Sequence, residues 1–150
     1  MRDKVKATAH RLGLDLDVRT LDRPTRTVQE AADAVGCRPD AIAKSIVFVA
    51  DGEPVLCVAS GAHRVDLNRL CEVLDCAEAR AASPDEVRAA TGFSVGGVAP
   101  FAHDLPVVFD ESLLDHERIW AAAGDGNSVF QVDPRALVRC TSATVARIDG

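Results

Sequence analysis

Gly96 and Gly97 stand between valines in the segment SVGGVAP, and Lys44 opens an apolar run well upstream of them. Backbone without a Cβ lets a ligand approach closely and can aim N–H groups at a carbonyl or phosphate oxygen. A lysine adds a compact cation on a flexible stem, which can hold a phosphate or polarise an ester. One interpretation of these residues is a site that binds an ester or a phosphate. The structural alternatives are a turn between strands and a solvated lysine at a strand start.

Three further segments could serve such a site. Asp110 ends the apolar segment PVVFD and would either cap a turn or support the glycine loop, while Ser60 and Gly61 follow a predicted strand. The segment AAAGDGN at 121–127 is typical of a hairpin turn. Its Gly124 could instead form a second wall of bare backbone.

The familiar signatures of hydrolases are missing from the sequence. It contains no G-x-S-x-G, H-E-x-x-H, P-loop or G-x-G-x-x-G motif, and its four histidines lack metal-ligand spacing. The five cysteines are odd in number and form no C-x-x-C pair, which favours reduced thiols in the cytoplasm. We therefore expect no metal, no cofactor and no protein nucleophile.

The charge and hydropathy of the chain limit its partners. The formal net charge is −6 over 150 residues, whereas proteins that grip long duplexes are usually basic. No apolar run is long enough to span a membrane, and the first residues show no signal peptide. We expect a cytoplasmic protein without DNA or membrane partners, whose contact with any nucleic acid is local.

The elements that must position these residues follow from periodicity and turn chemistry. Thr27 and Glu30 have capping-box spacing before an amphipathic helix at 28–35, and Asp51-Gly52 predicts a hairpin turn between apolar runs. Further helices are predicted at 5–12, 67–74, 84–91 and 134–140, and further strands at 14–18, 106–110, 118–124, 128–132 and 143–148.

The order of these elements lacks strict β-α-β alternation. We expect one domain over residues 1–150 with an α/β (mixed α+β) fold. Its compact, largely antiparallel, β-barrel-like sheet would be surrounded by helices, with a closed sheet as one alternative.

An ordered set of segments resembles a known family. The segments are IAKSIVFVADG, VASGAHRVD, TGFSVGGVAPF, PVVFDESLL, WAAAGDGNSVFQV and LVRCTSATVARI. Together they are similar to the YbaK/ProX/EbsC family of aminoacyl-tRNA deacylases, which also occurs as an editing insertion in bacterial prolyl-tRNA synthetases. The resemblance covers about residues 27–148.

The resemblance implies a trans-editing hydrolase that deacylates tRNA mischarged with a small amino acid, such as Cys or Ala on proline tRNA. Its partners would be the 3′ end of aminoacyl-tRNA and prolyl-tRNA synthetase. The family's lysine falls on position 44, its G-G-x-x-P loop on 96–100 and its D-E-S-L-L element on 110–114. The implied catalytic residues are Lys44, Gly96, Gly97 and Gly124, and the implied substrate-binding residues are Ser60, Gly61, Val98, Pro100, Asp110 and Ala123.

The implied mechanism is substrate-assisted. Lys44 would anchor the phosphate of the terminal adenosine, and backbone N–H groups would stabilise the ester oxyanion. The attacking group would be a positioned water helped by a ribose hydroxyl, or the thiol of a misattached cysteine.

The chain departs from the family pattern in ways that leave the amino acid open. It has no tyrosine, Ala122 and Ala123 stand where cysteine-specific members carry a serine, and Ser45 stands where alanine-editing members carry an asparagine. The alternative is a non-catalytic module of the same fold that binds a nucleotide or the tRNA 3′ end.

Overall fold

Strands of two separate sheets organise the computed structural model, which describes residues 2–14 and 16–150. The smaller sheet has the order β1-β7-β6, with β1 at Val18–Thr20, β7 at Ser128–Val132 and β6 at Ile119–Ala122. The larger sheet has the order β4-β2-β3-β5-β8, with β4 at Ala79–Ala81, β2 at Ala43–Ala50, β3 at Glu53–Ser60, β5 at Val107–Asp110 and β8 at Thr144–Ala146.

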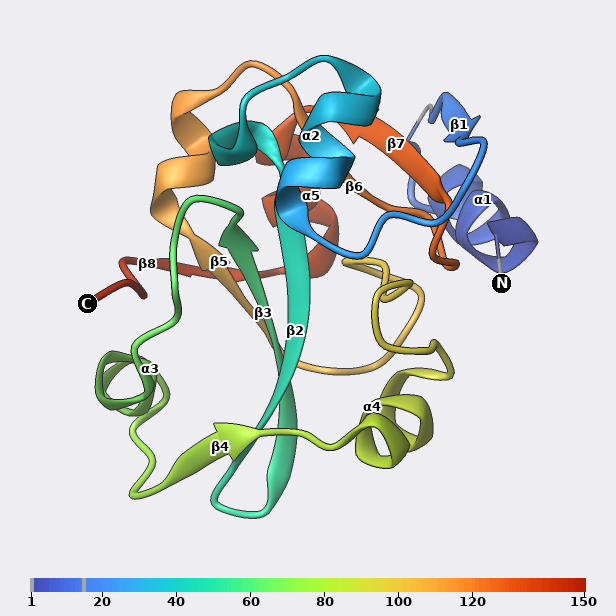
Figure 1. Cartoon of the computed structure of the whole chain (residues 1–150). Coiled ribbons are helices and arrows are strands. Elements are labelled where there is room, and N and C mark those ends of the chain that lie inside the picture. The colour runs from blue at the N-terminus through green and yellow to red at the C-terminus, as the bar shows by residue number, and fades with distance from the viewer. Residues whose placement is uncertain (1, 15) are drawn as a thin grey trace.

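The long β2–β3 hairpin runs through the middle of the molecule (Figure 1). Its register pairs Ala43 with Ser60 at one end and Ala50 with Glu53 at the other. The turn residues Asp51 and Gly52 have φ angles of 48° and 84°, as a two-residue hairpin turn requires. The predicted hairpin is confirmed, and it brings Lys44 and Ser60 to the same end of the sheet.

The pairing is mixed and largely antiparallel, as the sequence predicts. Every pair in the smaller sheet is antiparallel, as are β4-β2 and β2-β3, whereas β3-β5 and β5-β8 are parallel. The alternative of a closed sheet is wrong: in the described part of the chain the two sheets stay distinct and meet at an isolated bridge between Ile42 and Trp120. The outer strands β1, β4 and β8 are only three residues long, too short to continue a ladder around a barrel.

Helices cover both sheets. They are α1 at Arg2–Arg11, α2 at Val28–Val35, α3 at Leu67–Leu74, α4 at Pro84–Thr91 and α5 at Pro134–Thr141, with 3₁₀ turns η1 at Pro39–Ala41 and η2 at Glu111–Asp115. In Figure 1, α2 crosses near the smaller sheet, α1 lies beside β1, and α3 and α4 flank the far end of the β2–β3 hairpin. No helix within residues 2–14 and 16–150 has the length and apolar character needed to cross a bilayer.

Side-chain caps fix where α2 and α4 begin. The Thr27 hydroxyl accepts the Glu30 N–H at 3.1 Å, as predicted, but the Glu30 carboxylate accepts the N–H of Arg26 rather than that of Thr27. Ser83 and Glu86 form the complete reciprocal box at α4. The α2 cap therefore also holds the backbone of Arg26, which lines the cavity described below.

The alternation of β2 divides the core between two faces of the larger sheet. Val47 joins the larger cluster, which includes Phe93, Phe109 and Phe130. Phe48 joins a second cluster on the opposite face, which α3 covers through Leu70. Lys44 has the parity of Phe48, so its side chain leaves the strand on the α3 face.

One expected strand is wrong, and one observed strand was not expected. A strand at 14–18 is wrong, because Leu14 and Leu16 pack against the larger cluster from a loop and pairing starts only at Val18; Asp15 lies outside the described residues. No local pattern predicts β4, because its Ala-Arg-Ala composition has low β-propensity and only the pairing with β2 makes it a strand.

Candidate functional site

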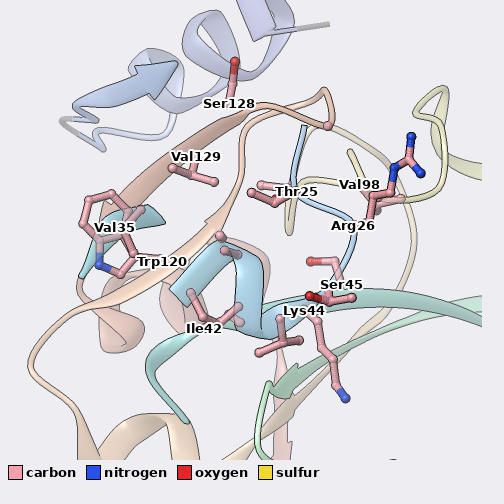
Figure 2. Close-up of a pocket in the computed structure, with 18 of the residues that line it drawn as sticks. Thr25, Arg26, Val35, Ile42, Lys44, Ser45, Val98, Trp120, Ser128 and Val129 are labelled. Carbon is pink, nitrogen blue, oxygen red and sulfur yellow. The ribbon is translucent and has the colours of Figure 1, made fainter. Parts of the chain in front are cut away.

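A small cavity lies between α2, the start of β2, the β6–β7 hairpin and the glycine loop (Figure 2). Its volume is about 160 Å³. Its lining residues are Thr25, Arg26, Thr27, Val28, Ala31, Val35, Ile42, Ala43, Lys44, Ser45, Gly96, Val98, Trp120, Ala121, Ala122, Asp125, Gly126, Ser128 and Val129. Residues in three ranges distant in sequence, 25–45, 96–98 and 120–129, therefore line one pocket.

One wall of the pocket is apolar. Val35 from α2, Ile42 before β2, and Trp120 and Val129 from the β6–β7 hairpin belong to one buried cluster. Trp120 is 8% exposed, and the Arg19 guanidinium lies 4.9 Å from its ring centroid. This cation–π contact holds the indole in place. The wall suits a short, uncharged side chain.

The glycine loop forms a tight turn at the pocket. The Gly97 N–H donates to the Ser94 carbonyl at 3.0 Å, and Gly96 has a φ of 90°, which is the pattern of a type II turn with glycine at its third position. This hydrogen bond removes the Gly97 N–H from the candidate oxyanion donors. Within residues 2–14 and 16–150, the N–H groups of Gly96 and Val98 have no intramolecular acceptor. These two are the donors available to a ligand.

Gly97 packs directly against the β6–β7 turn. A Cβ built on Gly97 would lie 2.8 Å from the Cα of Asp125, so only glycine lets the two backbones meet. Asp125 is the one carboxylate that lines the pocket in the described part of the protein, and its Oδ1 accepts the Asn127 N–H at 3.1 Å. The glycine at 97 thus lets the backbone of an acidic residue pack against the glycine turn.

The predicted residues Ala123 and Gly124 lie within that hairpin but do not line the pocket. The Ala123 N–H donates to the Ser128 carbonyl at 2.9 Å, which closes the turn. Gly124 has a φ of 104°, a conformation that favours glycine. Their neighbours Ala122 and Asp125 line the cavity instead. Both predicted residues therefore shape the wall from behind.

Lys44 lies at the edge of the pocket, and its amine is directed away from the apolar wall (Figure 2). The amine donates to the His63 carbonyl at 2.5 Å. Burial lowers the pKa of Lys44, and the Asp110 carboxylate offsets part of that effect. The lysine thus links the cavity to the polar residues at the end of β3.

Asp110, Ser60 and Gly61 lie outside the cavity wall, near the amine of Lys44. The buried Asp110 carboxylate accepts the Ser60 N–H at 2.9 Å and the His63 Nδ1 at 2.8 Å. A Cβ on Gly61 would lie 2.5 Å from the Pro39 carbonyl oxygen, so glycine is required there for close approach. These predicted binding residues fix the loop that follows β3 and do not line the cavity.

Pro100 lies apart from the other predicted residues. It borders a second cavity between α1 and the segment that follows the glycine loop, together with Lys4 and His103. Val98, two residues earlier, lines the first cavity. Lys44, Gly96 and Val98 thus line the same pocket, whereas Pro100 lines only the second cavity. The functional roles of all these residues stay predictions.

Sequence reasoning missed several lining residues. Arg26 and Thr25 were overlooked because they precede a helix in a segment that carries only loop signals. Asp125 lies in a turn in which only the two preceding residues were considered as site residues. Trp120 has the pattern of an ordinary core residue. The usable signal was the single tryptophan beside that turn, because an isolated large aromatic often forms a pocket wall.

The lining chemistry is limited to backbone amides, hydroxyls, one carboxylate and two cations. No histidine or cysteine from the described ranges lines the cavity. In the same ranges no group of three or more potential ligands is placed to hold a metal ion. The site can orient a polar ligand and bind an oxyanion.

Comparison with known proteins identifies relatives over most of the chain. The profile of the aminoacyl-tRNA editing domain matches residues 22–140. The uncharacterised protein YwhH of Bacillus subtilis is 37% identical over 124 residues, covering 81% of this chain and 78% of YwhH. The proline–tRNA ligase of Lactiplantibacillus plantarum is 30% identical over 122 residues, but the match spans only 21% of that ligase.

Solved structures share the whole fold. One, described as a candidate trans-editing enzyme for prolyl-tRNA synthetase, is 38% identical with a TM-score of 0.93 and covers 99% of this chain and 96% of its own. The hypothetical protein APE2540 is 31% identical with a TM-score of 0.92, over 98% of this chain and 99% of its own. The resemblance inferred from the ordered segments is therefore confirmed, and the chain belongs to the aminoacyl-tRNA editing domain family.

Proposed function

We propose that this protein is a trans-editing deacylase, which hydrolyses the ester of tRNA mischarged with a small amino acid such as cysteine or alanine on proline tRNA. The family match and the similarity to a candidate trans-editing enzyme support this assignment. The relatives among proline–tRNA ligases support proline tRNA as the substrate and prolyl-tRNA synthetase as a partner.

The observation that carries the proposal is the pairing of free backbone donors with a small apolar wall. Gly96 and Val98, whose N–H groups have no acceptor in the described residues, line the same cavity as Trp120 and Val129. An acyl ester has this character, because its carbonyl oxygen gains negative charge in the transition state while a small side chain needs only apolar contact. Fixed N–H donors are among the largest contributions to such catalysis.

The two cations are suited to the nucleotide part of the substrate. Lys44 stands at the pocket edge on a flexible stem and would exchange its contact with the His63 carbonyl for the phosphate of the terminal adenosine. Arg26 also lines the pocket, and the α2 cap holds its backbone N–H. Both residues would fix the ester over the glycine turn.

Asp125 fits the α-ammonium group that every aminoacyl ester carries. Within the described residues it is the one carboxylate that lines the cavity, and its backbone packs against Gly97. An ion pair there would orient the amino acid toward the apolar wall. The attacking group would then come from a positioned water helped by the ribose hydroxyl, or from the thiol of a misattached cysteine, because no histidine or cysteine lines the described site.

The test is a deacylation panel. Proline tRNA charged with cysteine, alanine, serine or proline is incubated with the wild-type protein and with Lys44→Ala, each with and without prolyl-tRNA synthetase. We expect hydrolysis of a mischarged species but not of prolyl-tRNA, and loss of that activity in Lys44→Ala. If the wild type hydrolyses none of the four under either condition, the deacylase proposal fails.

The lack of a histidine or cysteine in the described lining also favours a second candidate, a non-catalytic module that binds the tRNA 3′ end. Such a module would bind charged tRNA and protect its ester. Measuring binding and hydrolysis on the same charged tRNA separates the two functions, because only the deacylase shortens the half-life of the ester.

A further inference from the structure

Asp110 forms a fixed anion at the end of β5. It is 1% exposed, and its Oδ1 accepts the Ser112 N–H at 3.0 Å and the Ser112 hydroxyl at 2.8 Å. Its Oδ2 accepts the Ser60 N–H and contacts the His63 ring. Burial alone would raise the pKa of this carboxyl, but these hydrogen bonds outweigh burial and lower it. The group stays ionised and accepts hydrogen bonds only.

The ionised carboxylate fixes the protonation of the His63 ring. Nδ1 lies 2.8 Å from Asp110 Oδ2, so it must carry a proton to make this contact. The other ring nitrogen, Nε2, lies 3.8 Å from Asp149 Oδ2 at the partly exposed side of the ring. The carboxylate therefore sets both the tautomer and the orientation of the ring.

The same contacts exclude a Ser–His–Asp hydrolase at this place. Ser112 Oγ lies 3.4 Å from Nδ1, the nitrogen that already serves Asp110, and its proton is directed to the carboxylate. A catalytic triad needs the serine and the acid on opposite nitrogens of the ring. Ser112, His63 and Asp110 therefore do not form a catalytic triad, and their contacts need another explanation.

His63 contacts Lys44 through its backbone. The His63 carbonyl accepts the Lys44 amine at 2.5 Å, while the His63 ring is tied to Asp110. The loop that carries this carbonyl follows β3, and its preceding residue Ser60 is held by the same carboxylate. One residue thus connects the buried anion with the amine at the edge of the pocket.

We propose that His63 is a positioning residue for Lys44. Its ring, anchored on Asp110, holds the loop carbonyl that sets where the lysine amine waits before substrate binds. The inference rests on the proposed function for the role of Lys44 in hydrolysis, but the contact itself does not depend on that function. His63 does not itself line the pocket and acts only through its contact with Lys44.

The wild-type protein provides the first test. Nitrogen-15 NMR of the four histidine rings, with His63 assigned by the loss of its signals in His63→Ala, reports which ring nitrogen carries the proton. We expect a protonated Nδ1 on His63 at neutral pH. A neutral ring protonated on Nε2 alone would overturn the proposal, because Asp110 could not then accept from Nδ1.

The second test follows Lys44 directly. The chain contains three lysines, so carbon-13 lysine labelling gives few side-chain signals, and Lys44→Arg assigns the one that matters. In His63→Ala the loop loses its anchor and the amine gains solvent, so the Lys44 pKa should rise toward its ordinary value. An unchanged Lys44 titration in a folded His63→Ala protein would overturn the proposal.

Conservative variants separate positioning from general loop stability. The asparagine amide in His63→Asn can occupy the place of Nδ1, whereas the glutamine amide in His63→Gln reaches the place of Nε2. We expect wild-type Lys44 titration in His63→Asn and a raised Lys44 pKa in His63→Gln. If both variants behave alike, the Nδ1 contact does not position the lysine. This comparison still decides the matter if His63→Ala does not fold.

Activity then distinguishes the two proposals. In a deacylating protein, His63→Ala and His63→Gln should lower kcat/KM by roughly tenfold to a hundredfold, and His63→Asn should retain most of it. If the Lys44 titration shifts as expected but no variant or wild type hydrolyses charged tRNA, the deacylase proposal fails and the positioning role stands. If Lys44→Ala abolishes activity while His63→Ala changes neither titration nor kcat/KM, the positioning role fails.

Discussion

Gly97 and Asp125 bring the two backbone segments of the pocket into direct contact. A Cβ on Gly97 would lie 2.8 Å from the Cα of Asp125 and 3.0 Å from its backbone nitrogen, and neither atom can move without shifting the β6–β7 turn. The position of Asp125, the only carboxylate of the described lining, is therefore fixed relative to the glycine turn. Substitutions at the glycines can test how much the site depends on it.

Gly97→Ala and Gly96→Ala should impair the protein for different reasons. Gly97→Ala pushes the two turns apart, so we expect it to abolish most activity and destabilise the fold by about 1–3 kcal/mol. Gly96 faces open space but has a φ of 90°, so Gly96→Ala should cost roughly 1 kcal/mol from backbone strain. Urea denaturation and kcat/KM check both, and equal loss of activity in the two variants would contradict a specific role for the Gly97 contact.

The size of the cavity should limit the amino acid that is accepted. Ala31→Leu adds volume to the α2 wall and lowers helix propensity only slightly, so we expect nearly unchanged stability and loss of activity on the larger amino acids first. Ala34→Leu lies on the same helix but outside this cavity and is the matched control. The deacylation panel measures both variants, and equal effects would show that the cavity does not hold the amino acid.

The sequence predicts the elements that carry the site because their signals are local. The Asp51-Gly52 turn, the cap of α2 and the Ser83–Glu86 box each depend on residues within a few positions. The strand at 14–18 failed for the opposite reason. Leu14 and Leu16 alternate like a strand, but their burial comes from packing against distant residues rather than from a ladder.

The site was predictable only where a residue type itself limits the chemistry. Lys44 and the glycine pair could be identified because few other residues supply a flexible cation or a backbone without a Cβ. His63 and Asp125 could not be found in this way, because their importance lies in contacts across 47 positions to Asp110 and across the hairpin to Gly97. The His63–Asp110 contact depends on the pairing of β3 with β5, which no local pattern specifies.

The buried thiol of Cys57 predicts a loss of stability at alkaline pH. Burial raises its pKa from 9.0 to about 12, so the folded protein keeps the thiol proton that the unfolded chain releases. Its contribution is complete below pH 9 and is lost as the pH rises from 9 to 12. We expect the free energy of unfolding to fall in this range by an amount on the order of 4 kcal/mol, and less in Cys57→Ala. Urea denaturation across this pH range measures it, and parallel curves for both proteins would contradict the assignment.

The capping box of α4 should contribute to stability without affecting the site. Ser83→Ala removes the hydroxyl that accepts the Glu86 N–H at 3.2 Å, which should lower the free energy of unfolding by about 1 kcal/mol. The helix lies far along the hairpin from the pocket (Figure 1), so kcat/KM should not change. Thermal denaturation and the deacylation assay check the two statements. A fall in activity at a temperature where the variant is fully folded would connect α4 to the site.

The salt dependence of activity should report how few phosphates the protein contacts. With a net charge of −6 and two cations at the pocket, Lys44 and Arg26, about two phosphate contacts are expected. The logarithm of kcat/KM should then fall against the logarithm of salt concentration with a slope of roughly −1.4, because each contact with a single strand contributes about −0.7. Arg26→Ala should reduce the magnitude of the slope by one such contribution, and Arg88→Ala, an exposed cation of α4, should leave it unchanged. A slope several times steeper for the wild type, or one that Arg88→Ala also reduces, would mean that the tRNA body is gripped beyond the 3′ end.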